Sequence, residues 1–186
     1  MSRIGEELRG RCRPLDMRRS RSGWLFGCYC VGSVDQVSSV KKQERSTPRT
    51  LTRMTADQLE AFATRYTAAW CSHDPNAVAS FFAEDGSIAV NGGEPAVGRA
   101  AIAELVQGFY DAFPDTVVIM DRVRGAADNA VYLWTYEGTN TGPGGTGHAV
   151  RFNGWESWTF SADGLVAVSV GNFDADEYER QLSEGV

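Results

Sequence analysis

Residues 148–160 read HAVRFNGWESWTF, and this stretch decides the fold because polar and apolar side chains alternate along it. Successive side chains of a strand point to opposite faces, so Phe152, Trp158 and Phe160 share one face with Glu156. The other face holds Arg151, Asn153, Trp155, Ser157 and Thr159. Because the first set is the more apolar, we expect a long strand that turns Glu156 toward the core.

Three more runs of strand-like composition flank this stretch, at residues 116–124, 130–140 and 165–174. Turn-forming sequences separate them, namely Asp128-Asn129, residues 142–147 and Asp163-Gly164. Short strands in succession with such turns predict an antiparallel meander. A shorter strand is expected at residues 87–90, where Asn91-Gly92 marks the turn that follows.

Three helices are expected before the meander and a short one after it. Their ends are marked by the capping box Thr55–Gln58, the pair Asp74-Pro75, Gly98, Pro114 and a start near Asp176. These helices must cover one face of the sheet, so the sheet has to curl around them. We therefore predict an α+β fold in which a bent antiparallel sheet forms a cone around the N-terminal helices. The open end of the cone is a pocket suited to a small hydrophobic molecule.

Charge is distributed unevenly along the chain, whose net charge is −6 at pH 7. Residues 1–53 contain 12 Lys and Arg against 5 Asp and Glu, whereas residues 54–186 contain 6 arginines, no lysine and 19 acidic residues. An acidic domain without lysine binds nucleic acid poorly, because phosphate contacts need clustered cations. It also repels anionic membranes, and no apolar run approaches the roughly 18–20 residues that span a bilayer. We expect neither nucleic acid nor a membrane as a partner.

Residues 1–53 differ in composition from the domain at 54–186, and two interpretations stay open. An Arg-rich stretch followed by a short apolar run resembles a weak secretory signal. Alternatively, the segment is a disordered or non-native extension, with Met54 as the natural first residue. Three of the four cysteines lie in this segment, so no disulfide framework is indicated for the domain. Reduced thiols are the simplest interpretation, and they predict a cytoplasmic protein.

Several short segments of the domain follow the pattern of one known family. They are Trp70-x-x-His73-Asp74, Phe81-Phe82-Ala83-Glu84-Asp85-Gly86, Gly98-Arg99-x-x-Ile102, Phe113-Pro114-Asp115, Gly138-Thr139-Asn140-Thr141-Gly142, Asp163-Gly164, and Phe173-Asp174 with Gln181-Leu182. Through them, residues 54–183 resemble the SnoaL-like polyketide cyclase group of the nuclear transport factor 2-like superfamily. The resemblance implies the cone fold and homodimerisation through the sheet.

The same superfamily includes isomerases, cyclases, dehydratases, epoxide hydrolases and inert binding modules, so the resemblance implies no single activity. Two departures from its patterns bear on the chemistry. Asn140 stands where many SnoaL-like cyclases have histidine. The predicted strands also lack the Arg-x-Asp pair of the epoxide-hydrolase relatives.

Two carboxylates are the candidate catalytic residues. Glu156 is expected to lose solvation among aromatic rings, which raises its pKa toward the range useful for proton transfer. Alternation along 165–174 places Val166, Val168, Val170, Asn172 and Asp174 on one face. Asp174, which matches the SnoaL-like pattern, is then a candidate base beside a carbonyl group, with Asn172 as donor to the oxyanion. Three alternatives stay open: Asp174 caps the last helix, a bulge or register shift turns Glu156 outward, or a nearby arginine pairs with Glu156.

Residues expected on the concave side of the sheet are the candidate ligand contacts. They are Tyr66 and Trp70 in the first helix, Phe109 in the third, Trp134, Tyr136 and Asn140 in the strand at 130–140, Trp158, and Asp121 in the strand at 116–124. Asp121 also fits an ion pair with an arginine, and the aromatic face at 130–140 also fits a dimer interface. With two histidines, and no lysine in the Gly-rich stretch, neither a metal nor a cofactor is indicated.

Two hypotheses for the function follow. In the first, the protein is a cofactor-independent enzyme, cyclase- or isomerase-like, that performs acid–base catalysis on a small hydrophobic carbonyl compound. In the second, it is a non-catalytic ligand-binding or dimerisation domain, and its carboxylates are structural. A carboxylate with a pKa near neutrality favours the enzyme, whereas carboxylates that are all paired with arginines favour the binding domain.

Overall fold

The structure is a computed structural model, and it describes residues 54–126 and 128–186. The two interpretations of residues 1–53 concern a segment that lies outside the described residues. Within the described ranges, no helix combines the length and the apolar character that a membrane span requires.

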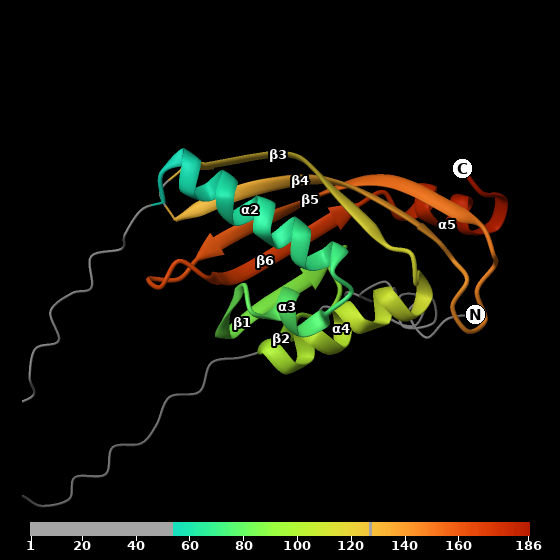
Figure 1. Cartoon of the computed structure of the whole chain (residues 1–186), viewed down its shortest axis with the longest axis horizontal. Helices are drawn as coiled ribbons and strands as arrows, with labels where there is room; N and C mark the ends of the chain where they lie inside the picture. Colours follow the sequence, from blue (N-terminus) through green and yellow to red (C-terminus); the bar gives the residue numbers. More distant parts are fainter. Residues whose placement is uncertain (1–53, 127) are drawn as a thin grey trace, which may run out of the picture. The chain divides into compact units, whose positions relative to one another are not determined.

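Three of the four helices in the described ranges begin at a residue whose side chain caps the helix. Helix α2 (Ala56–Cys71) has the predicted capping box, in which Thr55 and Gln58 exchange backbone-to-side-chain hydrogen bonds of 2.9 and 3.2 Å. Helices α3 (Pro75–Ala79), α4 (Arg99–Ala112) and α5 (Ala175–Glu184) follow, and α4 is the one without a side-chain cap. Helix α3 ends at Ala79, and Phe82 already belongs to the first strand, which therefore begins before the predicted residues 87–90. Figure 1 shows α2 crossing in front of the strands.

The strands form one six-stranded sheet in the order β2-β1-β6-β5-β4-β3. They are β1 (Phe82–Val90), β2 (Ala96–Val97), β3 (Val117–Ala126), β4 (Asn129–Thr139), β5 (Ala149–Phe160) and β6 (Val166–Phe173). Strands β3 to β6 form the predicted antiparallel meander. Strand β1 instead runs parallel to β6, so the sheet is mixed. The predicted α+β fold, in which helices accompany a single sheet, is confirmed.

Strand β5 has the predicted alternation. It pairs with β4 without interruption, and Phe152, Glu156, Trp158 and Phe160 are all buried. On the opposite face, Trp155 is 42% exposed. The alternative in which a register shift turns Glu156 outward is therefore excluded.

Strand β6 does not have the predicted alternation, because it contains a β-bulge. Val166 pairs with Phe160 and Val168 with the adjacent Thr159, which leaves Ala167 as an extra residue. Beyond the bulge every side chain changes face relative to a regular strand. The prediction that Val168, Val170 and Asn172 face inward is wrong: Ser169 and Gly171 are buried, whereas Val168 and Val170 are exposed.

Glycine at position 154 lets the ring of Trp134 pack closely against β5. A Cβ atom at this position would lie 2.3 Å from two ring carbons of Trp134, which no real contact tolerates. Gly154 and Trp134 are direct partners across the β4–β5 ladder. The glycine therefore fixes the place of an indole ring on the concave face of the sheet.

Candidate functional site

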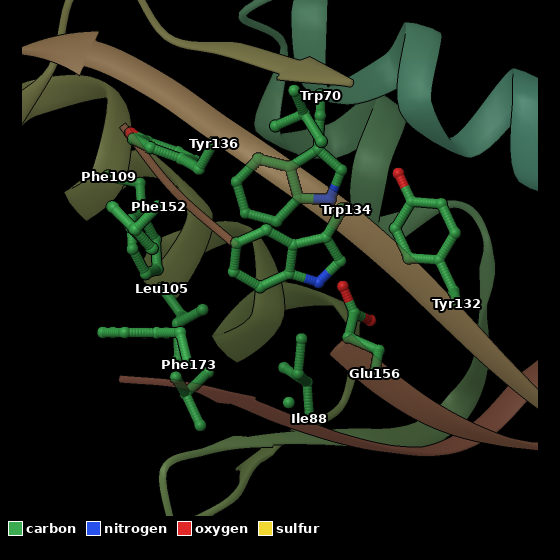
Figure 2. A pocket seen from close by; sticks show the side chains of 13 residues that line it. Trp70, Ile88, Leu105, Phe109, Tyr132, Trp134, Tyr136, Phe152, Glu156 and Phe173 are labelled. Atoms are coloured by element: carbon green, nitrogen blue, oxygen red, sulfur yellow. The ribbon is translucent and has the colours of Figure 1, made fainter. Parts of the chain in front are cut away.

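A cavity opens on the concave side of the sheet, beneath helices α2 and α4. Its lining consists of Trp70, Ile88, Val90, Leu105, Phe109, Val118, Tyr132, Trp134, Tyr136, Phe152, Glu156, Gly171 and Phe173. Figure 2 shows the rings of Trp70, Trp134 and Tyr136 grouped above it and Glu156 at its lower side. The partly buried members, among them Leu105, Phe109 and Phe173, form its mouth. Of the lining residues, Glu156 alone carries an ionisable carboxyl group.

The cavity volume is about 50 Å³. That space holds a few water molecules, whereas an apolar cavity that admits benzene has a volume of about 150 Å³. A ligand the size of a six-membered ring therefore has to extend into the mouth or displace one of its side chains. Phe109 and Phe173 are only partly buried, so they are the side chains to which such a displacement would apply.

Glu156 is anchored by three donors that all contact the same oxygen. Its Oε2 accepts hydrogen bonds from Trp158 Nε1 (2.8 Å), Ser169 Oγ (2.8 Å) and Tyr66 Oη (3.2 Å). Its Oε1 has only a long contact of 3.5 Å to the same Tyr66 hydroxyl. Because the lone pairs of Oε2 are occupied, a proton on this carboxyl group resides on Oε1. Oε1 is therefore the atom available for proton transfer.

Burial raises the pKa of Glu156 above its ordinary value of 4.5. The hydrogen bonds from Trp158, Ser169 and Tyr66 act in the opposite direction, because they stabilise the charged form, but they do not offset the loss of solvation. Burial, together with the nearby Glu156 carboxyl, also raises the pKa of Tyr66, which keeps its hydroxyl a neutral donor. The site thus contains a carboxyl group whose proton is held more tightly than in water.

The other polar groups around the cavity already have partners. The Tyr132 hydroxyl lies 2.8 Å from Thr67 Oγ1, and the Tyr136 hydroxyl lies 2.7 Å from Thr116 Oγ1. The exception is Trp134, whose Nε1 is buried without a hydrogen-bond partner among the described residues. Of the residues that line the cavity, Glu156 and Trp134 are therefore those whose side chains have a polar atom left for a ligand.

The predicted ligand contacts fall into two groups. Trp70, Phe109, Trp134 and Tyr136 line the cavity. Tyr66 and Trp158 are fully buried behind it and are absent from its lining; they position Glu156 instead. The prediction that these two residues contact a ligand is not supported, because their polar atoms are committed to the carboxyl group.

Asp174 and Asn172 lie away from the cavity lining. Asp174 is exposed and caps α5, since its carboxylate accepts a hydrogen bond from Glu177 N at 3.0 Å. Of the two alternatives for this residue, the structure has the helix cap. Asn172 pairs with the outward-facing Trp155, because the bulge at Ala167 reverses the faces of β6. The structure therefore does not bring Asp174 and Asn172 into the cavity lining that contains Glu156.

Asp121 and Asn140 also have other surroundings than predicted. Asp121 is the extra residue of a bulge in β3, is exposed, and accepts a hydrogen bond from Thr135 Oγ1 (2.9 Å). Asn140 is buried, but its amide bridges Ala112 O (3.2 Å) and Thr146 N (2.8 Å) and so holds the turn after β4. Neither residue belongs to the lining of the cavity.

Sequence reasoning missed a further part of the lining. The residues not among the candidates are Ile88, Val90, Leu105, Val118, Tyr132, Phe152, Gly171 and Phe173. For β5 and β4 the alternation was a sufficient signal, whereas Gly171 and Phe173 were assigned to the wrong face because of the bulge. Within residues 54–126 and 128–186, no group of three or more His, Cys, Asp or Glu side chains is arranged to hold a metal ion.

Comparison with known proteins gives a family match and a set of structural likenesses. The model of the SnoaL-like domain family matches residues 63–169. No curated protein matches the chain. These findings show the kind of domain and leave the activity open.

Solved structures with similar folds share little sequence with this chain. A putative hydroxylase, AclR, from Streptomyces galilaeus is 22% identical with a TM-score of 0.60, covering 70% of this chain and 98% of that one. A putative SnoaL-like polyketide cyclase from Jannaschia sp. CCS1 is 14% identical with a TM-score of 0.59, covering 72% and 99%. A hypothetical protein with a ketosteroid isomerase-like fold from Catenulispora acidiphila, in complex with trimethylamine, is 18% identical with a TM-score of 0.57, covering 62% of this chain and 87% of that one. At these identities the likeness concerns the fold.

Proposed function

This chain belongs to the SnoaL-like domain family, and from its cavity we propose that it binds a small, mainly apolar carbonyl compound on which Glu156 acts as a proton acceptor and donor. One observation carries the proposal: a buried carboxyl group with a free oxygen faces an otherwise apolar cavity. A base whose pKa is raised toward the working pH is suited to removing a proton from carbon.

The chemistry needs no cofactor. Glu156 Oε1, as carboxylate, takes a proton from the carbon next to the carbonyl group. The C–H electron pair forms a C=C bond, and the C=O π pair moves to oxygen, which gives an enolate. Glu156 then exchanges this proton with solvent and delivers a solvent-derived proton to the same carbon, or it transfers the proton to a conjugated carbon in an enone. The first outcome is hydrogen exchange and the second is isomerisation, and both conserve all atoms.

Hydrogen exchange tests this proposal without knowledge of the natural substrate. Small cyclic ketones and enones are incubated with the protein in D₂O, and loss of the α-proton signal is followed by NMR. We expect exchange to be faster than in buffer for at least one compound. Gly171→Ala is the matched variant. Its Cβ would meet Glu156 Cγ at 3.5 Å, an ordinary contact that narrows the cavity, so we expect this variant to exchange more slowly than the wild type. Equal rates for wild type, variant and buffer would contradict the proposal.

We infer further that the outer face of the sheet forms a homodimer. Among the described residues, apolar side chains of four strands are exposed on that face: Val117 and Ile119, Val131 and Leu133, Trp155, and Val168 and Val170. Leu133 and Trp155 are direct neighbours across the β4–β5 ladder. An apolar face of this extent is typical of an association surface, and a second copy supplies an identical face around a two-fold axis.

The dimer proposal predicts different outcomes for two matched valine-to-lysine variants. Val170 is 39% exposed on the outer face, and Val97 is 61% exposed on the edge strand β2. Val170→Lys places two unpaired charges in a symmetric interface, so we expect the dimer dissociation constant to rise by at least about 100-fold. Val97→Lys is expected to leave it unchanged. Sedimentation across a concentration series measures both, and a wild-type monomer at all concentrations would refute the dimer.

A further inference from the structure

The indole nitrogen of Trp134 is a polar group that the fold leaves unused. Among the described residues it is the buried side-chain polar atom that has no hydrogen-bond partner. An unpaired buried donor costs about 1–3 kcal/mol, so such a group in a native site calls for a reason. Figure 2 shows this nitrogen on the side of the ring that is turned toward Glu156. The donor therefore belongs to the same end of the cavity as the carboxyl group.

Close packing around the Trp134 ring holds this nitrogen in place. The Trp134 ring lies over Gly154, where any side chain would collide with it. Phe152 and Phe173 pack edge-on against the same ring, with centroids 6.0 and 6.4 Å away. A ring held on several sides cannot turn its N–H toward solvent. The donor is therefore preorganised for a partner that arrives in the cavity.

We propose that Trp134 Nε1–H donates a hydrogen bond to the carbonyl oxygen of the bound compound, so that the cavity selects neutral cyclic ketones and enones with a single oxygen. This inference rests on the proposed function, because it assumes that a small molecule occupies this cavity. A ligand with several polar groups would leave most of them unpaired, since the Tyr132 and Tyr136 hydroxyls are bonded elsewhere. A cationic ligand would pair with Glu156 and leave the Trp134 N–H unpaired.

The same hydrogen bond to the carbonyl oxygen gives Trp134 a role in proton transfer. When Glu156 removes a proton from the carbon next to the carbonyl group, negative charge develops on the carbonyl oxygen. A fixed N–H donor in an apolar cavity stabilises that charge more than it stabilises the neutral ketone. Glu156 is then the base, and Trp134 is the donor to the developing oxyanion.

Indole N–H signals of ¹⁵N-labelled protein test the inference directly. The full chain has five tryptophans, and the signal missing from Trp134→Phe is that of Trp134. The probes are cyclohexanone, methylenecyclohexane, which has the same shape without the oxygen, and cyclohexylammonium. We expect cyclohexanone alone to move the Trp134 N–H signal downfield. We also expect Trp134→Phe to weaken cyclohexanone binding about tenfold and methylenecyclohexane binding less than twofold.

The outcomes separate this inference from the proposed function. Equal binding of the ketone and the hydrocarbon, with no movement of the Trp134 signal, overturns the inference and leaves ligand binding in the cavity intact. Tighter binding of cyclohexylammonium than of cyclohexanone also overturns it. Failure of all three probes to move any cavity resonance overturns the proposed function as well. Where Trp134→Phe folds poorly, the comparison of cyclohexanone with methylenecyclohexane binding to the wild-type protein decides the matter, because it needs no assignment of the Trp134 signal.

Discussion

Replacing Glu156 with alanine is expected to lower the free energy of unfolding by about 3 kcal/mol. The substitution removes the acceptor of Trp158 Nε1–H, Ser169 O–H and Tyr66 O–H, all of which are buried. Glu156→Gln is the matched control, because the amide oxygen can accept the same three hydrogen bonds while the NH₂ group replaces Oε1. We expect the control to lose less than about 1 kcal/mol at pH 5. Urea unfolding measures both values.

The same pair of proteins has a defined dependence on pH. The folded-state pKa of Glu156 lies above the ordinary 4.5, so the folded state keeps this proton to higher pH than the unfolded chain does. The stability that the proton confers is complete below pH 4.5 and is lost as pH rises through the folded-state pKa. Each unit of separation corresponds to about 1.4 kcal/mol. Relative to Glu156→Gln, the wild type should therefore lose stability as the pH rises above 4.5.

A pH-independent difference between wild type and Glu156→Gln would contradict this account. So would an alanine variant as stable as the glutamine variant. The first result would mean that Glu156 titrates normally in the folded state. The second would mean that its three donors find other partners when the carboxyl group is removed.

Glu156→Gln is further expected to slow α-proton exchange on a ketone that the protein turns over by a factor of about 10² to 10⁴. An amide cannot accept a proton from carbon, although it preserves the hydrogen bonds to Trp158 and Ser169. Glu156→Asp keeps a carboxylate but shortens its reach, so we expect a smaller loss. The wild-type rate should rise with pH through the folded-state pKa, because the carboxylate is the base, and the glutamine variant should lack this rise. NMR in D₂O provides the rates.

If Glu156→Gln exchanges as fast as the wild type, the alternative of a non-catalytic binding domain gains support. In that case the carboxyl group serves to hold Tyr66, Trp158 and Ser169 together. The predicted stability difference between Glu156→Ala and Glu156→Gln would remain, because that difference depends on the hydrogen bonds alone. Ligand binding seen by the Trp134 signal would persist.

The helix ends and the central strand could be predicted from local chemistry. The Thr55–Gln58 capping box and the alternation around Glu156 each depend on a few neighbouring residues, and the structure has both as expected. The faces of β3 and β6 could not be predicted, because each strand contains one extra residue, Asp121 or Ala167, that no turn signal marks. The pairing of β1 parallel to β6 depends on contacts far apart in sequence.

The polar groups of the site could be predicted only in part. A carboxyl group flanked by aromatic residues at alternate positions was a sufficient signal for Glu156. The partner of each N–H or hydroxyl depends on the three-dimensional packing. Neither the hydrogen bond between the Tyr132 hydroxyl and Thr67 nor the unpaired nitrogen of Trp134 could therefore be predicted from residue spacing. Asp174 shows the converse, since a conspicuous carboxylate proved to be a helix cap.

One extra residue in β6 decides which side chains face Glu156, because it reverses the alternation of the residues that follow it. With Ala167 present, Ser169 and Gly171 lie on the concave side and the valines lie outside. A homologue that lacks this one position, but is otherwise identical, would present Val168 and Val170 to the interior and would have no hydroxyl beside the carboxyl group. Relatives of this protein should therefore be aligned on the bulge before their interiors are compared, because one gap misplaced in β6 exchanges inside for outside.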